Sequence, residues 1–198
     1  MKIIGLCGGS GSGKGTVSKL FLKHGIPSID TDAVYHSITS ELTPCVSELA
    51  ARFGEGIIKS DGSLDRRSLG RIVFSDESGL SGKDLNRITH KYVLERVREI
   101  ITEYGASGVS AVLVDAPMLF ESGFDKECHK IICVLADKNI RIARILIRDG
   151  ISYEDAERRI ASQLSDTELA SRCDFVIENN KDIDDLDRRV REIVNLIK

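Results

Sequence analysis

A glycine-rich segment near the start of the chain constrains its fold more than any other feature. Residues 8–14 read Gly-Gly-Ser-Gly-Ser-Gly-Lys and directly follow the short apolar run Lys2–Leu6. Residues 16–23 then show the apolar periodicity of a helix. A strand that passes through such a loop into a helix presents backbone N–H groups and a helix N-terminus to an anion. The segment therefore predicts an α/β fold with a phosphate site after the first strand, rather than a merely flexible turn.

Short apolar runs bounded by turn residues alternate with longer segments of helical periodicity along the chain. Most of these runs are β-branched or apolar throughout, as strands covered on both faces must be. The sequence therefore predicts a five-stranded parallel sheet with helices on both faces, closed by an amphipathic helix that begins near Ile183 and ends near Ile197. The predicted strands are Lys2–Leu6, Ser28–Asp30, Ala111–Asp115, Ile131–Leu135 and Phe175–Glu178.

Residues 33–105 interrupt this alternation, because they contain helical patterns and a turn at Ser60–Ser63 but no convincing strand. The last pattern predicts a helix over about Lys83–Tyr104, with apolar residues at steps of three and four. The chain has three prolines and no low-complexity tract, so nothing marks a linker between independent domains. We expect a single domain over residues 1–198, with residues 33–105 as a helical insertion.

The composition indicates a globular protein and argues against two classes of partner. Hydrophobic residues make up 41% of the chain and charged residues 30%, which is close to the average for folded domains. The net charge is -3, so no overall positive field exists to hold nucleic acid or an anionic membrane. No apolar run approaches the ~20 residues of a membrane span. We expect a cytoplasmic protein, monomeric or weakly self-associating, without nucleic-acid or membrane partners.

The cysteines favour the same compartment. The chain has five of them, an odd number, with no Cys-x-x-Cys pair and no histidine at zinc-finger spacing. The pattern predicts free thiols, as in most cytoplasmic proteins. They are Cys7, Cys45, Cys128, Cys133 and Cys173.

The predicted phosphate site depends on the backbone of the loop and on Lys14. Glycines permit the torsions that turn successive N–H groups inward, and the lysine adds a positive charge at the β- and γ-phosphates. Gly15 stands where a serine or threonine hydroxyl usually meets Mg²⁺, and Thr16 follows it. Either Thr16 substitutes, directly or through water, or the ion depends on the phosphates and on Asp115. The predicted nucleotide-binding residues here are Gly9, Gly11, Ser12, Gly13, Lys14, Gly15 and Thr16.

Two acidic positions at strand ends are candidates for chemistry. Asp115 ends an apolar run, where a Walker B carboxylate holds Mg²⁺, although it could instead cap the next turn. Asp30 and Asp32 lie at the end of the second predicted strand, and the carboxyl ends of parallel strands share one edge of a sheet. Phosphoryl transfer to a hydroxyl needs a carboxylate near the nucleophile, for which Asp32 is the candidate. The alternative is that Asp32 caps a helix, and Asp30 could be structural.

Three arginines, Arg141, Arg144 and Arg148, recur at steps that place them on one helix face. They are either a solvated face paired with Asp137, Asp149 and Glu154, or part of a lid over about residues 138–165. A lid arginine neutralises charge on the transferring group and helps to exclude water. Arg144 and Arg148 are the lid candidates.

Seven segments in a fixed order match the pattern of one known family: residues 4–14, 29–32, 53–54, 61–67, 114–121, 144–149 and 174–179. On these segments the whole chain resembles the dephospho-CoA kinase family. This resemblance implies a P-loop kinase core with a helical acceptor-binding insertion and a small lid. It implies transfer of a phosphoryl group from ATP, with Mg²⁺, to the ribose 3'-hydroxyl of dephospho-CoA, the last step of coenzyme A synthesis. Asp32 would be the base, Arg144 and Arg148 the lid arginines, and Asn179 would lie in the segment lining the adenine side of the ATP pocket.

The chain departs from the family pattern at two places. The family usually has serine where Gly15 stands, which bears on metal coordination and ATP affinity. It usually has His-Pro where His90-Lys91 stands, in the helix entering the acceptor region. His90 is either an acceptor contact or a core histidine.

Two other functions fit parts of the sequence. A nucleoside monophosphate kinase would share the Gly-Lys-Gly-Thr of residues 13–16, but residues 115–118, Asp-Ala-Pro-Met, lack the Asp-Gly-Phe-Pro-Arg type of segment found in adenylate kinases. A GTP-dependent switch protein needs an Asn-Lys-x-Asp motif, which residues 180–182 approach with the wrong spacing. The switch protein would also need an Asp-x-x-Gly motif after the strand that ends at Asp115, and none is present there.

Overall fold

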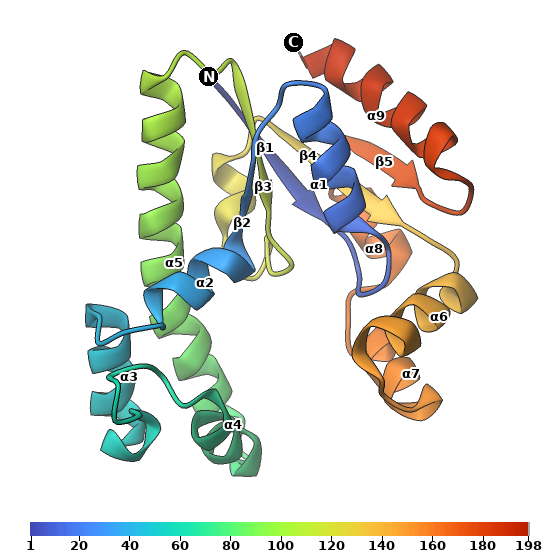
Figure 1. Cartoon of the computed structure of the whole chain (residues 1–198). Helices are drawn as coiled ribbons and strands as arrows, with labels where there is room; N and C mark the ends of the chain where they lie inside the picture. Colours follow the sequence, from blue (N-terminus) through green and yellow to red (C-terminus); the bar gives the residue numbers. More distant parts are fainter. Residues whose placement is uncertain (198) are drawn as a thin grey trace. The chain divides into compact units, whose positions relative to one another are not determined.

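A computed structural model of the chain describes residues 1–197 and contains a five-stranded sheet (Figure 1). The strand order is β2-β3-β1-β4-β5, and β1 pairs in parallel with both β3 and β4. All five predicted strands are confirmed, and β1 and β4 are each one residue longer than predicted. The strands are β1 (Lys2–Cys7), β2 (Ser28–Asp30), β3 (Ala111–Asp115), β4 (Lys130–Leu135) and β5 (Phe175–Glu178).

The chain divides into two compact units, each with its own core. Residues 1–29 and the chain from Glu103 onward form the first unit, and residues 30–102 form the second. No helix among the described residues combines the length and the apolar character needed to cross a bilayer.

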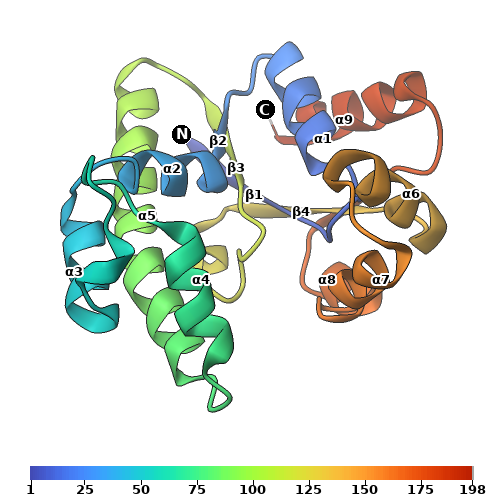
Figure 2. The same ribbon diagram turned by 60° about the horizontal axis from the view of Figure 1, so that its bottom comes forward.

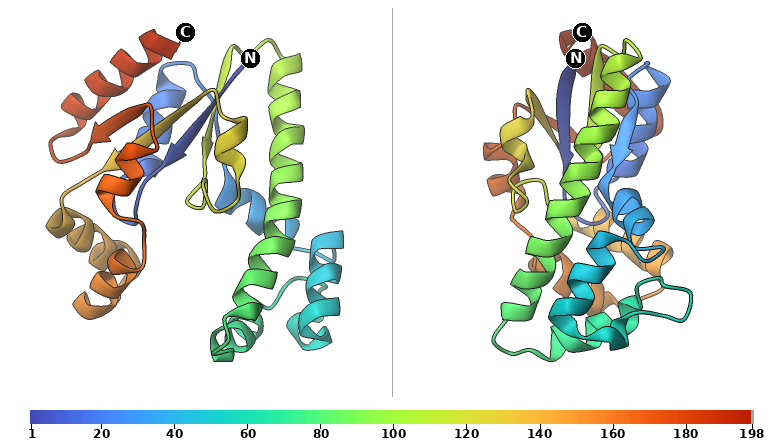
Figure 3. Two further views of the ribbon diagram at one scale, coloured as in Figure 1. Left: turned by 180° about the vertical axis from the view of Figure 1, so that it is seen from behind. Right: turned by 90° about the vertical axis from the view of Figure 1, so that its left-hand side faces the viewer.

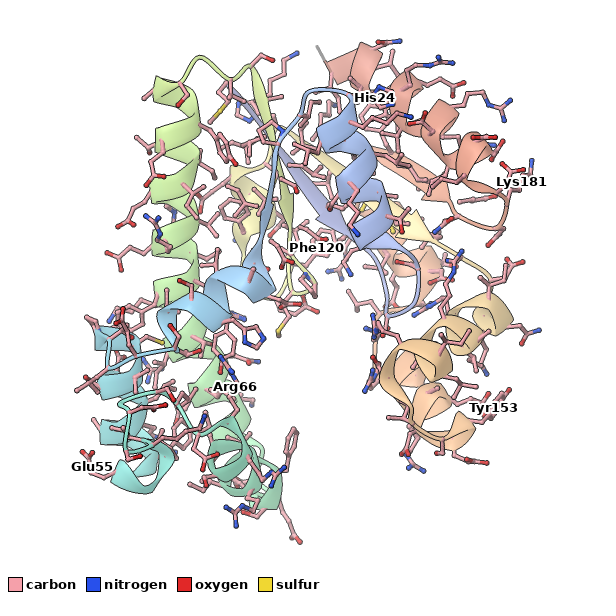
Figure 4. The ribbon with its side chains drawn as sticks, viewed as in Figure 1. His24, Glu55, Arg66, Phe120, Tyr153 and Lys181 are labelled. Carbon is pink, nitrogen blue, oxygen red and sulfur yellow. The ribbon has the colours of Figure 1, made fainter. Side chains whose placement is uncertain are left out.

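One face of the sheet in the first unit is covered by α1 (Lys14–Lys23) and α9 (Ile183–Ile197). Phe21 of α1 and Val190 of α9 are fully buried against alternate strand residues such as Leu6. His24, labelled in Figure 4, follows α1 and lies 2.7 Å from Asp187 of α9, which joins the two helices at that end. The short helix α8 (Asp166–Ser171) contacts β4, and the view from behind in Figure 3 shows it on the opposite face.

Two further helices of the first unit, α6 (Lys138–Asp149) and α7 (Tyr153–Ala161), lie side by side (Figure 2). Ile142, Ile145 and Ala156 form a small core between them. The turn that joins the helices uses Gly150 in the left-handed region, with φ of 63°, a conformation that favours glycine. The predicted lid segment is therefore a helical hairpin with its own apolar contacts. A 3-10 turn, η2 (Phe124–Glu127), precedes β4.

The second unit is helical, with α2 (Thr31–Ile38), α3 (Pro44–Phe53), α4 (Arg66–Ser75) and most of α5 (Leu80–Ala106). Its core includes Leu49, Leu69 and Ile88. Its β-pairing among the described residues is one isolated bridge, Ile58 to Leu64, which follows the 3-10 turn η1 (Glu55–Ile57) and encloses the predicted turn. The predicted helix over about Lys83–Tyr104 is present and extends a little further at each end.

The start of α2 corrects one interpretation of the sequence. Asp30, not Asp32, is the N-cap: its Oδ1 accepts hydrogen bonds from the backbone N–H groups of Asp32 and Ala33, at 2.9 and 3.1 Å. The cap lies two residues earlier than in the alternative in which Asp32 caps the helix, because the Asp30 carboxylate already satisfies the exposed N–H groups of the first turn. Asp32 therefore lies within the first turn of α2, and its side chain is left for another role.

Candidate active site

The loop between β1 and α1 has a backbone that only glycine allows at several positions. Gly8, Gly11 and Gly13 have φ angles of 148°, 77° and 100°. A Cβ on Gly13 would lie 2.1 Å from Asn179 Nδ2, and one on Gly11 would lie 2.5 Å from the carbonyl oxygen of Arg141. Since both contacts are far shorter than van der Waals distance, side chains are excluded by space as well as by torsion.

Three successive carbonyl groups of this loop, those of residues 10–12, are held by side chains from distant parts of the sequence. Arg141 and Arg144 reach them from α6, and Asn179 reaches them from the residue after β5. Arg141 and Asn179 are buried, with 4% and 5% exposure. The distances are 2.9 Å from Arg141 Nε to Ser10 O, 3.2 Å from Arg144 Nη1 to both Gly11 O and Ser12 O, and 2.7 Å from Asn179 Nδ2 to Ser12 O.

This arrangement sets the direction of the loop's N–H groups. In a trans peptide the N–H points opposite to the preceding carbonyl. Because the carbonyls of Ser10 and Ser12 point to these side chains, the N–H groups of Gly11 and Gly13 point away from them. The N–H of Ser12 closes a turn onto Gly9 O at 3.1 Å. Inward N–H groups beside a helix N-terminus form an anion-binding concavity.

Lys14 and Ser12 add polar groups to the concavity. Lys14 is the first residue of α1, and its Nζ donates to Gly8 O at 3.2 Å, which joins the two ends of the loop. The side chain of Ser12 is 1% exposed, and its Oγ has no hydrogen-bond partner among the described residues. A buried hydroxyl left in this state costs about 1–3 kcal/mol, which a ligand oxygen can offset.

The candidate metal ligands follow the loop and the neighbouring strand. Asp115 is the last residue of β3, and its Oδ2 accepts a hydrogen bond from Ser18 Oγ of α1 at 3.3 Å. Thr16 is exposed in the first turn of α1. Carboxylate and hydroxyl oxygens suit Mg²⁺, so this donor set fits the ion. Gly15 has helical backbone, and an added Cβ would meet nothing within 4 Å.

The three arginines of α6 have different partners. Arg148 donates to Asp149 Oδ1 at 2.7 Å, as expected for an ion pair, and also to Ser10 Oγ at 3.3 Å. Asp149 pairs in addition with Arg159 of α7. Hydrogen bonds from Arg148 and Arg159 lower the pKa of Asp149 to about 2. The expected solvated face is therefore present only at Arg148, because Arg141 and Arg144 contact the loop.

Sequence reasoning missed the role of Arg141. Its guanidinium donates to Asp166 Oδ1 and to Gln163 Oε1, both at 3.0 Å, besides the loop carbonyl. Gln163 Oε1 also accepts from the backbone N–H of Ser10 at 2.9 Å. The sequence signal that pointed to Arg141 was its place in the series of three arginines. The structure adds that its neighbour Ile142 is buried. Neither Gln163 nor Asp166 belongs to a motif that would single it out.

A cavity of about 390 Å³ adjoins the loop. Phe120, labelled in Figure 4, forms part of its wall beyond the carboxyl end of β3, and the guanidinium carbon of Arg172 lies 5.3 Å from the centre of its ring. Gly8 and Gly9 of the loop and Gln163 also line this cavity. Of the remaining predicted residues, Asp32 is exposed on α2 and His90 is half-buried on α5, both in the second unit.

The chain is similar over most of its length to proteins of one kind. Residues 2–185 match the family model described as dephospho-CoA kinase. A dephospho-CoA kinase from Symbiobacterium thermophilum is 40% identical over 184 residues, 93% of this chain and 76% of that protein. The one from Geobacter sulfurreducens is 37% identical, over 98% of this chain and 97% of that protein. The solved structure of dephospho-CoA kinase from Campylobacter jejuni has a TM-score of 0.73 at 26% identity, covering 100% of this chain and 98% of that chain.

Proposed function

The chain belongs to the dephospho-CoA kinase family, and from this premise we propose that it transfers the γ-phosphoryl group of ATP to the ribose 3'-hydroxyl of dephospho-CoA. The products are coenzyme A and ADP, and the fold is that of a P-loop kinase. Among the chain's own residues, the loop at positions 8–14 carries the proposal. Side chains hold its carbonyls outward, so that its N–H groups point into the anion-binding concavity.

Lys14 and the loop backbone bind the phosphates of ATP in this proposal. The N–H groups of Gly11 and Gly13 point into the concavity, and Ser12 supplies a buried hydroxyl. Lys14 would leave the Gly8 carbonyl, which it contacts at 3.2 Å, for the β- and γ-phosphates. Fixed donors of this kind stabilise the charge that develops during phosphoryl transfer without having to reorganise.

Asp32 is the proposed base that positions the acceptor hydroxyl and accepts its proton. Asp30 already caps α2, so the Asp32 carboxylate is not required for that purpose, which supports this role. Arg144 and Arg148 are the proposed arginines of a lid over about residues 138–165. Both extend from α6 to the loop: Arg148 donates to the Ser10 side chain and to Asp149, and Arg144 donates to the carbonyls of Gly11 and Ser12.

Thr16 and Asp115 are the residues that would hold Mg²⁺. The ion, when bound, neutralises charge on the phosphates of ATP and helps to orient them. Asp115 can act directly or through a water, and Ser18 fixes the orientation of its carboxylate through the hydrogen bond to Oδ2.

The test is ADP release by the purified protein with ATP and Mg²⁺, in parallel reactions with dephospho-CoA, with AMP and without an acceptor. We expect release only with dephospho-CoA, and a product whose mass is greater by one phosphate. Stimulation by AMP alone would instead indicate a nucleotide kinase, and release without an acceptor would indicate an ATPase. The comparisons give no support to the adenylate-type alternative.

A further inference from the structure

Three of the five cysteines come together next to the phosphate loop, although they are far apart in the sequence. Cys7 is the last residue of β1, and Cys133 is its register partner on β4. Cys173 lies between α8 and β5. The three Sγ atoms lie within 4.8 Å of one another, and those of Cys7 and Cys173 are 3.5 Å apart. All three are free thiols.

The three thiols differ in their access to solvent. Cys7 and Cys133 are 1% and 0% exposed, whereas Cys173 is partly exposed. Hydrogen bonds from the Cys133 and Cys7 thiols lower the pKa of Cys173, while their contacts within the cluster raise the pKa of Cys7 and Cys133. Because Cys173 is the one thiol of the three that is partly exposed, it is the one that a small reagent can reach, with Cys7 and Cys133 buried beside it. The thiolate is the reactive form of cysteine.

We propose that Cys173 is a site of thiol–disulfide exchange with low-molecular-weight disulfides, and that Cys7 is the thiol that resolves the adduct into a Cys7–Cys173 disulfide. The 3.5 Å between their sulfur atoms is already short, so bond formation needs a movement of about 1.5 Å to reach the usual S–S length. Cys133 acts as a hydrogen-bond donor and remains a thiol during the exchange.

The exchange takes place in two steps. First, the Cys173 thiolate attacks one sulfur of the small disulfide; the S–S bond of the reagent breaks, and one small thiolate leaves. Then Cys7 attacks Cys173 Sγ, the mixed disulfide breaks, and the second small thiolate leaves with the proton from Cys7. The two protein thiols are oxidised by two electrons, and the small disulfide is reduced to two thiols.

A thiophilic metal ion is the competing explanation for three neighbouring thiols. A structural zinc site usually has four protein ligands, whereas the cluster offers three ligand atoms within the described part of the chain. The unequal exposure of the thiols also favours exchange, since one reactive thiol faces solvent and its partner lies behind it. We therefore treat metal binding as an outcome of the test.

Cys128 provides a matched control within the same chain. It is partly exposed like Cys173, but within the described part of the chain its Sγ hydrogen-bonds to the carbonyl oxygen of Phe124, at 3.4 Å, and not to another thiol. Burial raises the pKa of the Cys128 thiol to about 12. In the full-length reduced protein at pH 7, we expect iodoacetamide to modify Cys173 at least about tenfold faster than Cys128.

The decisive experiment treats the full-length protein with glutathione disulfide and maps the linkages by mass spectrometry without reduction. We expect a Cys7–Cys173 linkage in the wild type and in Cys128→Ser, and no such linkage in Cys173→Ser. Cys7→Ser should retain one glutathione on Cys173, and Cys7→Ala serves if the serine variant does not fold. Equal alkylation of Cys173 and Cys128 in the wild type would overturn the proposal. So would a bound Zn²⁺ that protects all three cysteines from alkylation. None of these readouts depends on kinase activity.

Discussion

Replacing Asn179 by aspartate tests whether the phosphate loop is held in its binding geometry from outside. Asn179 Nδ2 donates to Ser12 O at 2.7 Å, and its side chain is 5% exposed. Aspartate has the same shape but, when ionised, places a carboxylate oxygen against the carbonyl. Loss of a buried hydrogen bond in this way costs about 1–3 kcal/mol, with the upper end expected for a charged group.

The cost of Asn179→Asp can appear in two measurements. If the loop keeps its geometry, the free energy of unfolding falls, and for a chain of this size the melting temperature decreases by roughly 2–12 °C. If the loop relaxes instead, ATP binding must reorder it, and the Kd for ATP rises by up to roughly 100-fold. We therefore expect the two losses together to reach about 1–3 kcal/mol, measured by denaturation and by calorimetric titration with ATP.

Asn180→Asp is the control, because it makes the same chemical change at the next residue. Asn180 is exposed, and among the described residues its side chain exchanges hydrogen bonds with Asp137. The variant replaces the hydrogen bond to the Asp137 carboxylate by repulsion between two exposed carboxylates, and an exposed charge pair is worth about 0.2–1 kcal/mol, so its cost should stay below that of the buried change at Asn179. If Asn179→Asp were indistinguishable from this control in both measurements, the idea that Asn179 holds the loop would be refuted.

Three further predictions concern the metal, the base and the lid. Gly15→Ser and Gly15→Ala should both stabilise α1 by up to about 1 kcal/mol, since an added Cβ meets nothing within 4 Å. Only the serine variant should need less Mg²⁺ for half-maximal activity. Equal Mg²⁺ dependence of the two variants would show that no hydroxyl is needed at this position. Asp32→Asn should lower kcat by about 10²- to 10⁴-fold with little change in acceptor KM; a change in KM alone, in steady-state assays, would make Asp32 a binding residue only. The pKa of Asp149 is lowered to about 2, so its ion pairs should stabilise the α6–α7 hairpin above about pH 4 and lose this effect as the pH falls towards 2. An NMR titration of the Asp149 carboxyl carbon should have its midpoint near 2. A midpoint near the ordinary value of about 3.9 would contradict the pairing.

The sheet was predictable because each strand carries its own local signal. Ala111–Asp115 is a continuous apolar run that ends in a turn, and its predicted and observed bounds are the same. The long helix α5 was also evident from the three- and four-residue spacing of its apolar residues, including Ile88 and Val97. The ends of α5 were harder to predict, because the spacing of apolar residues does not mark the residues at which the helix begins and ends.

The partners within the candidate site were harder to predict, because they join residues distant in the sequence. The loop itself is a local motif, but nothing near residues 10–12 indicates that Arg141 and Asn179 hold their carbonyls. The cysteines show the same limit. Spacing along the chain gave no reason to group Cys7 with Cys173, which become neighbours only through the order of β1, β4 and β5 in the sheet.

The contacts between α6 and the phosphate loop have a thermodynamic consequence. Arg141 and Arg144 extend from α6 to the carbonyls of residues 10–12, so α6 cannot move away as a rigid body without releasing the loop. The position of the helix and the affinity of the loop for an anion are therefore linked equilibria. By reciprocity, if docking of α6 raises the affinity of the loop for a nucleotide, binding of the nucleotide favours the docked helix by the same free energy. Binding of ATP at the loop should therefore slow amide hydrogen exchange in the α6–α7 hairpin, which can be measured with and without ATP.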